Sequence, residues 1–482
     1  MGKEEKTIIV SQTHWDREWY LTFNRFRFRL VAMIDRLLDI LEKDKEFKSF
    51  MMDGQTSPIE DYLAIKPENK ERLAKFIKEK RIILGPFYVQ NSPWLQTGEG
   101  YVKNLIQGHL DVEPFGVPAM KVGYIPDQFM HFEQMPQVLR GFGVYAMGFS
   151  RGMGNQKVEH DLKFEFTWKA PDGSEITALH LEAGYGQCTG LPYDPDAAVN
   201  MILFGKAGIN KLEKSTNWSL LFSGSDHRVP EAVLPEAIKL WNSIEEITED
   251  EGTLQHGSLE EYVQNVLAEK PELSTYTGEI IGHRYQFSAP GVMSSCMWLK
   301  KKNFMAHDLL ERYTQPLSVI SKSISGANYD GYIILAWKWL LKNQAHDSSW
   351  TASWDQTEKE IETRYDWAIQ NADEVKCWSF MDITTRIKVI SESNKQAEIT
   401  IFNPLQFSRK ETIFVTMPRT FDMEDGYTII DGEGKKLEST FEKVEITNKE
   451  IFLTRKFVGS HGGRPKYYYN LVIEAVEVPA VG

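Results

Sequence analysis

The chain has 482 residues, of which 42% are hydrophobic and 26% are charged, a composition typical of globular proteins that excludes disordered and fibrous classes. This length exceeds what one hydrophobic core usually organises, so two or three domains are expected. The net charge of −13, from 55 Lys and Arg against 68 Asp and Glu, disfavours nucleic acid and anionic membranes as partners.

The cysteines and the first residues exclude further classes. Three cysteines are too few for a disulfide framework or a four-cysteine zinc site, so reduced thiols are expected. The hydrophilic start Met1–Lys6 and the short apolar run Ile8–Val10 predict neither a signal peptide nor a membrane span. We therefore expect a cytoplasmic protein without a membrane partner, and a homo-oligomer is left open.

Strand-like and helix-like patterns alternate over the first 285 residues. The β-branched run Thr7–Val10 is followed by apolar residues at helical spacing across Val31–Leu41. Further apolar runs end at turn residues, and these are Arg81–Leu84, Val122–Ile125 and Leu220–Phe222. The alternation predicts a mostly parallel sheet or an irregular (β/α) barrel in residues 1–285.

The pattern changes beyond this region. Long helical stretches predict a three-helix bundle in residues 286–394, and these stretches are Cys296–Val319, Tyr332–Lys342 and Glu358–Val375. Short β-type runs then predict a β domain of sandwich type in residues 395–482, and these runs are Ile399–Phe402, Ile413–Thr416 and Tyr467–Tyr469. The predicted fold is therefore a multidomain chain with α/β, all-α and all-β parts.

The pair His14-x-Asp16 places two potential metal ligands directly after the first predicted strand. Roughly one or two His-x-acid pairs are expected by chance in a chain of this composition. This chain has four, because similar pairs begin at His109, His131 and His180. Taken alone, the first pair is more readily explained by chance than by function.

Asp16, Asp127 and Asp226 share one position, because each follows an apolar strand-like run. The C-terminal ends of parallel strands are where α/β folds keep their active sites. A single Asp there is more often a helix cap, but three could combine a metal site with the paired acid and base of a glycosidase.

His346 is a fourth candidate ligand. It follows the apolar helical run Tyr332–Leu341, where it could also be only a charge at a helix C-terminus. Two histidines and two aspartates would suit zinc and leave a position for substrate, although composition leaves manganese and cobalt open.

Aromatic residues near these points could stack against sugar rings, and they are Trp15, Trp19, Tyr20, Trp94, Tyr185 and Trp350. Each one alone is more often a core residue. The roles of His131, Arg151 and His227 are also left open, since lone residues of these types commonly satisfy buried or surface hydrogen bonds.

Four motifs in order carry a resemblance to a known family, and they are Thr13–Trp19, Gly123–Phe129, Gly224–His227 and Asn343–Asp347. With the supporting segments Met52–Thr56 and Ile401–Pro404, the chain resembles glycoside hydrolase family thirty-eight over essentially its whole length. It looks closest to the microbial members. The resemblance implies a class II α-mannosidase, which hydrolyses terminal α-linked mannose with retention of configuration and holds one zinc ion per chain.

The resemblance also implies roles for single residues. His14, Asp16, Asp127 and His346 match the zinc ligands of the family. Asp127 also matches the nucleophile that forms a covalent mannosyl-enzyme intermediate, while Asp226 matches the general acid/base. A retaining site places two such carboxyl groups about 5 Å apart, one ionised and one protonated.

The remaining carried-over positions contact the sugar in the family, and they are Trp19, Arg151, Tyr185 and Asp347. Two features differ from the family pattern: Met130 stands where Gly is usual, and Ser348–Thr351 replaces a Gly-containing turn. Both lie in the expected pocket wall and leave linkage and aglycone specificity open. In longer relatives the final segment Val478–Gly482 lies within the β region, so a truncated chain with an incomplete β domain is expected.

Two other interpretations stay open. A metal-dependent carbohydrate deacetylase also places Asp and His ligands on an irregular α/β barrel, and it releases acetate by means of a metal-activated water. Asp226 on a separate strand end distinguishes the glycosidase, which needs it as a protonated acid. A mannose-binding protein without turnover is the non-enzymatic alternative.

Overall fold

The computed structural model describes residues 5–387, 398–417, 426–445 and 467–480. The chain divides into two compact units, Met1–Asp308 with Tyr332–Ala372 and Leu309–Gly331 with Asp373–Gly482. The helical residues that the sequence groups into one domain are thus shared between the two units. The predicted divisions near residues 285 and 395 stay predictions.

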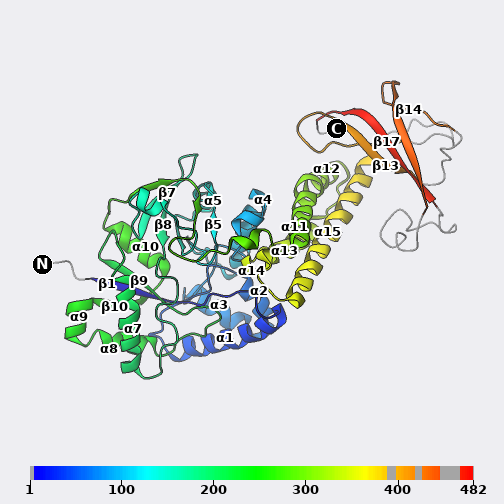
Figure 1. The fold of residues 1–482 in the computed structure, drawn as a ribbon. Helices are drawn as coiled ribbons and strands as arrows, with labels where there is room; N and C mark the ends of the chain where they lie inside the picture. Colours follow the sequence, from blue (N-terminus) through cyan, green and yellow to red (C-terminus); the bar gives the residue numbers. More distant parts are fainter. Residues whose placement is uncertain (1–4, 388–397, 418–425, 446–466, 481–482) are drawn as a thin grey trace. The chain divides into compact units, whose positions relative to one another are not determined.

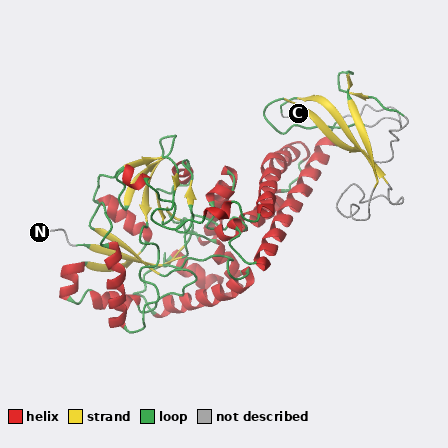
Figure 2. Ribbon diagram, viewed as in Figure 1, coloured by secondary structure: helices red, strands yellow, loops and turns green. Residues whose placement is uncertain are grey.

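The first unit begins with alternating strands and helices (Figures 1 and 2). Its strands are β1 (Lys6–Ser11), β2 (Phe50–Met51), β3 (Ile82–Ile83), β4 (Val122–Tyr124), β5 (Met130–His131), β6 (Ala146–Phe149), β7 (Glu165–Lys169), β8 (Glu175–His180), β9 (Trp218–Ser223), β10 (Thr253–Gly257), β11 (Thr275–Thr277) and β12 (Ile280–Ile281). Its early helices are α1 (Phe23–Lys43), α2 (Ser57–Leu63), α3 (Lys70–Lys78), α4 (Gly98–Val112), α5 (Met135–Gly141), α6 (Gln156–Glu159), α7 (Pro195–Ile209), α8 (Leu234–Trp241), α9 (Glu245–Glu251), α10 (Leu259–Ala268) and α11 (Met297–Asp308).

Parallel pairing dominates these strands. One sheet has the order β10-β1-β9, with Val10 opposite Phe222 on one side and Gly257 on the other. A second sheet has the order β11-β7-β8-β6-β4 and is parallel except between β7 and β8, while β2-β3 and β12-β5 form short pairs. The mixed α/β class is confirmed. Closure of these sheets into a barrel stays a prediction.

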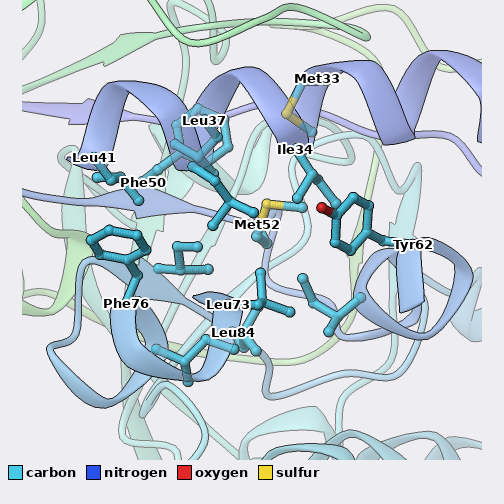
Figure 3. Packing of buried hydrophobic residues seen from close by; sticks show 14 of the residues in the cluster. Met33, Ile34, Leu37, Leu41, Phe50, Met52, Tyr62, Leu73, Phe76 and Leu84 are labelled. Atoms are coloured by element: carbon cyan, nitrogen blue, oxygen red, sulfur yellow. The ribbon is translucent and has the colours of Figure 1, made fainter. Parts of the chain in front are cut away.

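Helix α1 shows why the N-terminal region folds as it does. Its buried residues recur every three or four positions, which places them on one face of a helix. Figure 3 shows Ile34, Leu37 and Leu41 of this face packed over Met52 and other residues near β2 and α3. Burying each such side chain contributes about 1.5–3 kcal/mol. This packing fixes β2 and the loop after it, which carries part of the site.

The later helices are α12 (Gln315–Ser325), α13 (Asp330–Lys342), α14 (His346–Trp350) and α15 (Asp355–Thr384). The single stretch predicted over Cys296–Val319 is wrong in detail, because α11 ends at Asp308 and a π-helical turn, Leu309–Thr314, precedes α12. Pro316 lacks the N–H that a regular helix needs there, which accounts for the interruption. Among the helices that the structure describes, none is both long and apolar enough to cross a lipid bilayer.

The C-terminal strands are β13 (Arg409–Met417), β14 (Ile429–Ile430), β15 (Lys436–Leu437), β16 (Ser439–Glu445) and β17 (Tyr467–Val478). They form an antiparallel sheet of order β13-β17-β16 and the pair β14-β15, in which Tyr469, Leu471 and Ile473 alternate into a small core. The predicted strand Ile399–Phe402 is wrong, because those residues pair with no strand in the described part of the chain. Pro404 directly after Asn403 removes a ladder donor, and the Asn403 side chain instead bonds the carbonyls of Phe407 and Pro479.

A three-residue ion cluster links α2 to α13. Glu60 accepts hydrogen bonds from Lys338 at 2.8 Å and Lys342 at 2.9 Å. Burial by itself would raise the pKa of Glu60, but the two lysines lower it from 4.5 to about 2.

The Glu60→Gln variant is expected to be less stable at pH 7 by about 1–3 kcal/mol. The folded pKa is depressed, so the contribution is present above pH 4.5 and is lost as the pH falls towards about 2. Denaturant titrations between pH 7 and pH 3 should therefore show the two proteins converging in acid. Glu68→Gln, which breaks an exposed 3.8 Å pair with Lys66, is the matched control and should change stability little. A gap between wild type and Glu60→Gln that is independent of pH would contradict this account.

Candidate metal centre and active site

Two neighbouring parallel strands deliver the first site residues. β1 and β9 run side by side in register, so their carboxyl ends meet at one edge of the sheet. Just beyond them His14 and Asp226 form a further parallel bridge, with the His14 N–H donating to the Ser225 carbonyl at 3.1 Å. The His227 N–H donates back to the His14 carbonyl at 2.8 Å. The loops that carry His14 and Asp226 are therefore fixed against each other.

The four ligands expected from the resemblance are brought together. The Nε2 atoms of His14 and His346 each lie 3.2 Å from Oδ1 of Asp16. The Nε2 atom of His346 also lies 3.5 Å from Oδ2 of Asp127. His14, Asp127 and His346 can together offer ligand atoms to one metal ion, and so can Asp16, His346 and Asp347.

Both imidazoles are oriented by their second ring nitrogen. Nδ1 of His14 lies 3.1 Å from the Asp53 carboxylate, and Nδ1 of His346 donates to the Gln90 carbonyl at 3.1 Å. In the neutral form of each ring, Nδ1 therefore carries the proton and Nε2 presents a lone pair. These two Nε2 atoms and Oδ1 of Asp16 are buried without a hydrogen-bond partner. Buried polar atoms are normally paired, so three that converge on one point fit a metal ion.

The spacing of these atoms also fits. Tetrahedral ligands held about 2.1 Å from a zinc ion lie about 3.4 Å from one another. The measured separations of 3.2, 3.2 and 3.5 Å agree with that value. Nitrogen and carboxylate oxygen donors suit zinc and also allow manganese or cobalt.

The electrostatics of the cluster favour a cation. Burial by itself would raise the pKa of Asp16, but His14 and His346 hold it well below its usual value. Burial would lower the pKa of His14, yet Asp53 and Asp16 raise it well above the ordinary range. Burial also raises the pKa of Asp347 strongly, and Asp16 adds to the rise. The carboxylates thus attract positive charge, which a divalent ion would supply.

Asp127 has a separate set of partners on each oxygen. Its Oδ1 accepts hydrogen bonds from Nε of Arg151 and, at 3.3 Å, from the Tyr185 hydroxyl, while its Oδ2 faces His346. Burial would raise the pKa of Asp127, but His346, His14 and Arg151 lower it. The carboxylate is therefore held ionised.

Asp226 differs from Asp127 because it is exposed. It interacts electrostatically with Tyr185, as Asp127 does, so both carboxyl groups lie around the same phenol. Trp19 is half-buried after the ligand loop, and Asp347 is buried with Oδ2 at 3.9 Å from Nε2 of His346. Arg151, Tyr185 and Asp347 thus contact residues of the cluster, and the roles of all four candidates for sugar contact stay predictions.

Two aromatic candidates instead support the site. Trp15 is buried in the core and contacts Phe26 and His227 edge-on. Trp350 is buried and stacks on Phe129 with ring centres 3.9 Å apart. These rings form walls and are not open stacking platforms.

Sequence patterns assigned no role to two supporting residues. Asp53 is buried after the two-residue strand β2 and accepts from four donors, which are His14, the Trp15 N–H, Gln55 and Gln90. The backbone φ of Asp53 is +55°, which is uncommon for a residue with a side chain. The Asp-Gly pair in the sequence is typical of such a turn and could have indicated this position. No local pattern singles out Gln90, whose carbonyl holds His346 and whose side chain donates to Asp53.

Fold and site together define a mixed α/β protein with a buried histidine and carboxylate cluster at the carboxyl ends of parallel strands. Residues 4–279, more than half of the chain, match the family model of the glycosyl hydrolases family 38 N-terminal domain. The chain belongs to this family, as the motifs predicted.

Individual relatives agree with the family match. The chain is 30% identical to a putative mannosylglycerate hydrolase of Halalkalibacterium halodurans, over 92% of this chain and 50% of that protein. It is 22% identical to alpha-mannosidase 2C1 of Homo sapiens, over 72% of this chain and 32% of that protein. The crystal structure of an alpha-mannosidase from Enterococcus faecalis is similar with a TM-score of 0.81 and 27% identity, over 99% of this chain and 55% of that one. The chain thus spans about half the length of its similar microbial relatives.

Asp53→Asn is expected to weaken metal binding at this cluster about 10- to 100-fold. All four contacts are donated to Asp53, so the NH₂ group of asparagine would face at least one donor and release His14. Competition with a chromophoric chelator measures the dissociation constant. Asp111→Asn is the control, since this carboxylate bonds Thr56 and Gln107 and touches no candidate ligand. Equal zinc affinity in wild type and Asp53→Asn would show that the carboxylate does not support the site.

Proposed function

We propose that this chain carries the catalytic site of a zinc-assisted, retaining α-mannosidase. The observation that carries the proposal is that buried His14 and His346 meet half-buried Asp127 beside the strand end that bears Asp226. Membership of glycosyl hydrolases family 38 supports it, as do the names of the similar relatives.

The proposed metal ligands are His14, Asp16, Asp127 and His346. When bound, a zinc ion would act as a Lewis acid toward sugar hydroxyls and stabilise charge that develops in the transition state. The protein's own part is to aim the Nε2 atoms of both imidazoles into the cluster, through Asp53 and the Gln90 carbonyl.

Two carboxyl groups perform the covalent steps in this proposal. Asp127, held ionised, attacks the anomeric carbon and forms a mannosyl ester, while Asp226 donates its proton to the departing glycosidic oxygen. Asp226 then takes a proton from water, and the water oxygen displaces Asp127 from the anomeric carbon. Mannose leaves with its α configuration, and both carboxyl groups return to their starting protonation states.

Their surroundings match these roles. Asp127 lies where Arg151, Tyr185 and His346 hold its charge, so it is ready to attack. Asp226 is exposed, so a leaving group of variable size and the incoming water can both reach it. Trp19, Arg151, Tyr185 and Asp347 are proposed to hold the sugar ring.

The deciding experiment is an assay of the zinc-supplemented protein against a panel of α-mannosides. The panel includes mannosylglycerate, because one similar relative is named as a putative mannosylglycerate hydrolase. Release of mannose, with the α anomer seen first by NMR, is the expected result. Release of acetate from acetylated sugars without mannosidase activity would support the deacetylase instead. Calorimetric mannose binding without turnover would support the binding protein.

The Asp226→Asn variant distinguishes the proposed roles of the Asp226 and Asp127 carboxylates. Loss of the acid should slow the hydrolysis of mannosides with poor leaving groups by about 10²- to 10⁴-fold. The first step with nitrophenyl mannoside should slow much less, because nitrophenolate leaves without protonation. Asp127→Asn should be inactive on both substrates, because no nucleophile remains. Steady-state and burst kinetics on the two substrates measure the difference. Equal losses on both substrates in Asp226→Asn would count against an acid role for Asp226.

A further inference from the structure

Two buried charges follow the ligand Asp16 directly along the chain. Arg17 and Glu18 are 6% and 1% exposed, although adjacent charged residues in a loop are normally solvated. Arg17 bonds Asp61 of α2 at 2.9 Å, which anchors the loop within its own region of the sequence. Glu18 has partners much further along the chain.

Glu18 joins two segments that are distant in sequence. Its Oε1 accepts a 2.6 Å hydrogen bond from the Ser348 hydroxyl, across 330 residues of chain. It also accepts from Nη2 of Arg364 on α15. Glu18 lies two residues after Asp16, and Ser348 lies two residues after His346, so this contact connects the two ligand-bearing segments.

Arg364 holds the same segment at a second point. Its Nε donates to Oδ1 of Asn343 at 2.6 Å, and Asn343 in turn donates to the Ile361 carbonyl at 2.9 Å. Arg364 is 5% exposed, so the charge of its guanidinium needs the Glu18 carboxylate as a partner. Residues 343–348 are thereby tied to both α15 and the Asp16 loop.

Burying the charges of Glu18 and Arg364 costs more free energy than an apolar packing contact would. Removing two charges from water is expensive, and apolar residues of similar size are often at least as stabilising. A buried pair is therefore weak evidence for stability, and here it holds the two segments that must meet at 3.2 Å between Asp16 and His346. Its directional hydrogen bonds fix orientation as well as separation.

We infer that Glu18, Ser348 and Arg364 form a positioning network that sets the separation of Asp16 and His346 and thereby the metal affinity. None of the three is among the proposed metal ligands, catalytic carboxylates or sugar contacts. The inference rests on the proposed metal site.

The main test is Ser348→Ala, which removes one hydroxyl and leaves the ion pair in place. Zinc affinity should fall about tenfold, at the low end for supporting residues of metal sites. Chelator competition measures the dissociation constant well below the unfolding temperature, where lower global stability alone would not change it. The cobalt-substituted protein should also show a shifted visible absorption spectrum, because ligand geometry changes.

Ser349→Ala is the matched control on the same short helix. Its hydroxyl is also buried but bonds only the His346 carbonyl within one turn, so zinc affinity and the cobalt spectrum should stay near wild type. A second variant, Glu18→Leu with Arg364→Met, removes both charges together and avoids an unpaired buried ion. It should fold and still lose at least tenfold in zinc affinity.

The outcomes separate this inference from the proposed function. If wild type binds no zinc, the proposed metal site is wrong. If wild type binds zinc and both the Ser348→Ala and the double variant bind it equally well, the positioning network is wrong while the metal site stands. A loss in Ser349→Ala as large as that in Ser348→Ala would also overturn the inference.

Discussion

The structure depends on how the buried carboxylate of Asp16 is neutralised. It lies 3.2 Å from imidazole nitrogens of both His14 and His346, and more carboxylates, those of Asp53 and Asp347, surround the same histidines. Such a concentration of acid is unfavourable away from water unless positive charge balances it. The hydrogen bonds around the site therefore hold the basic groups in place as much as the acidic ones.

Strand geometry explains how these residues meet. β1 and β9 pair in register, so His14 and Asp226, which lie just beyond the two strands, are neighbours through their backbones. His346 arrives on the separate helix α14, whose N-terminal end is held because the His346 N–H donates to the Gln90 carbonyl at 2.9 Å. The same carbonyl also receives Nδ1 of His346, so one backbone group fixes both the helix and the ring.

Sequence patterns located the candidate ligands because each stands at a visible boundary. Asp16 and Asp127 follow apolar runs that became β1 and β4, and His346 follows the run that became α13. The Ile399–Phe402 pattern failed, because alternation makes a segment suitable for a sheet without supplying a neighbour to pair with. The runs predicted in the N-terminal region end within two residues of the observed strands, whereas Ile413–Thr416 and Tyr467–Tyr469 cover only parts of β13 and β17.

The support of the site was not predictable. Glu18 and Arg364 look like ordinary surface charges, and only a partner 346 residues away in sequence makes them buried. Asp53 follows a two-residue strand, too short for a pattern to register. No local rule pairs such residues, because the contacts exist only once the helices after residue 296 return to the first strands.

In the proposed mechanism the carboxylate of Asp127 serves both a metal and a reaction, and its two oxygens have separate partners. Binding a cation draws electron density from a nucleophile, so a carboxylate that does both must keep the two demands apart. Arg151 and Tyr185 hold Oδ1, while Oδ2 faces the nitrogen of His346 in the cluster. Each oxygen thus has its own environment, and a rotation of the carboxylate would break contacts on both sides. The ionised state follows from the cluster as a whole, since His346, His14 and Arg151 together lower the pKa of Asp127 against the effect of burial.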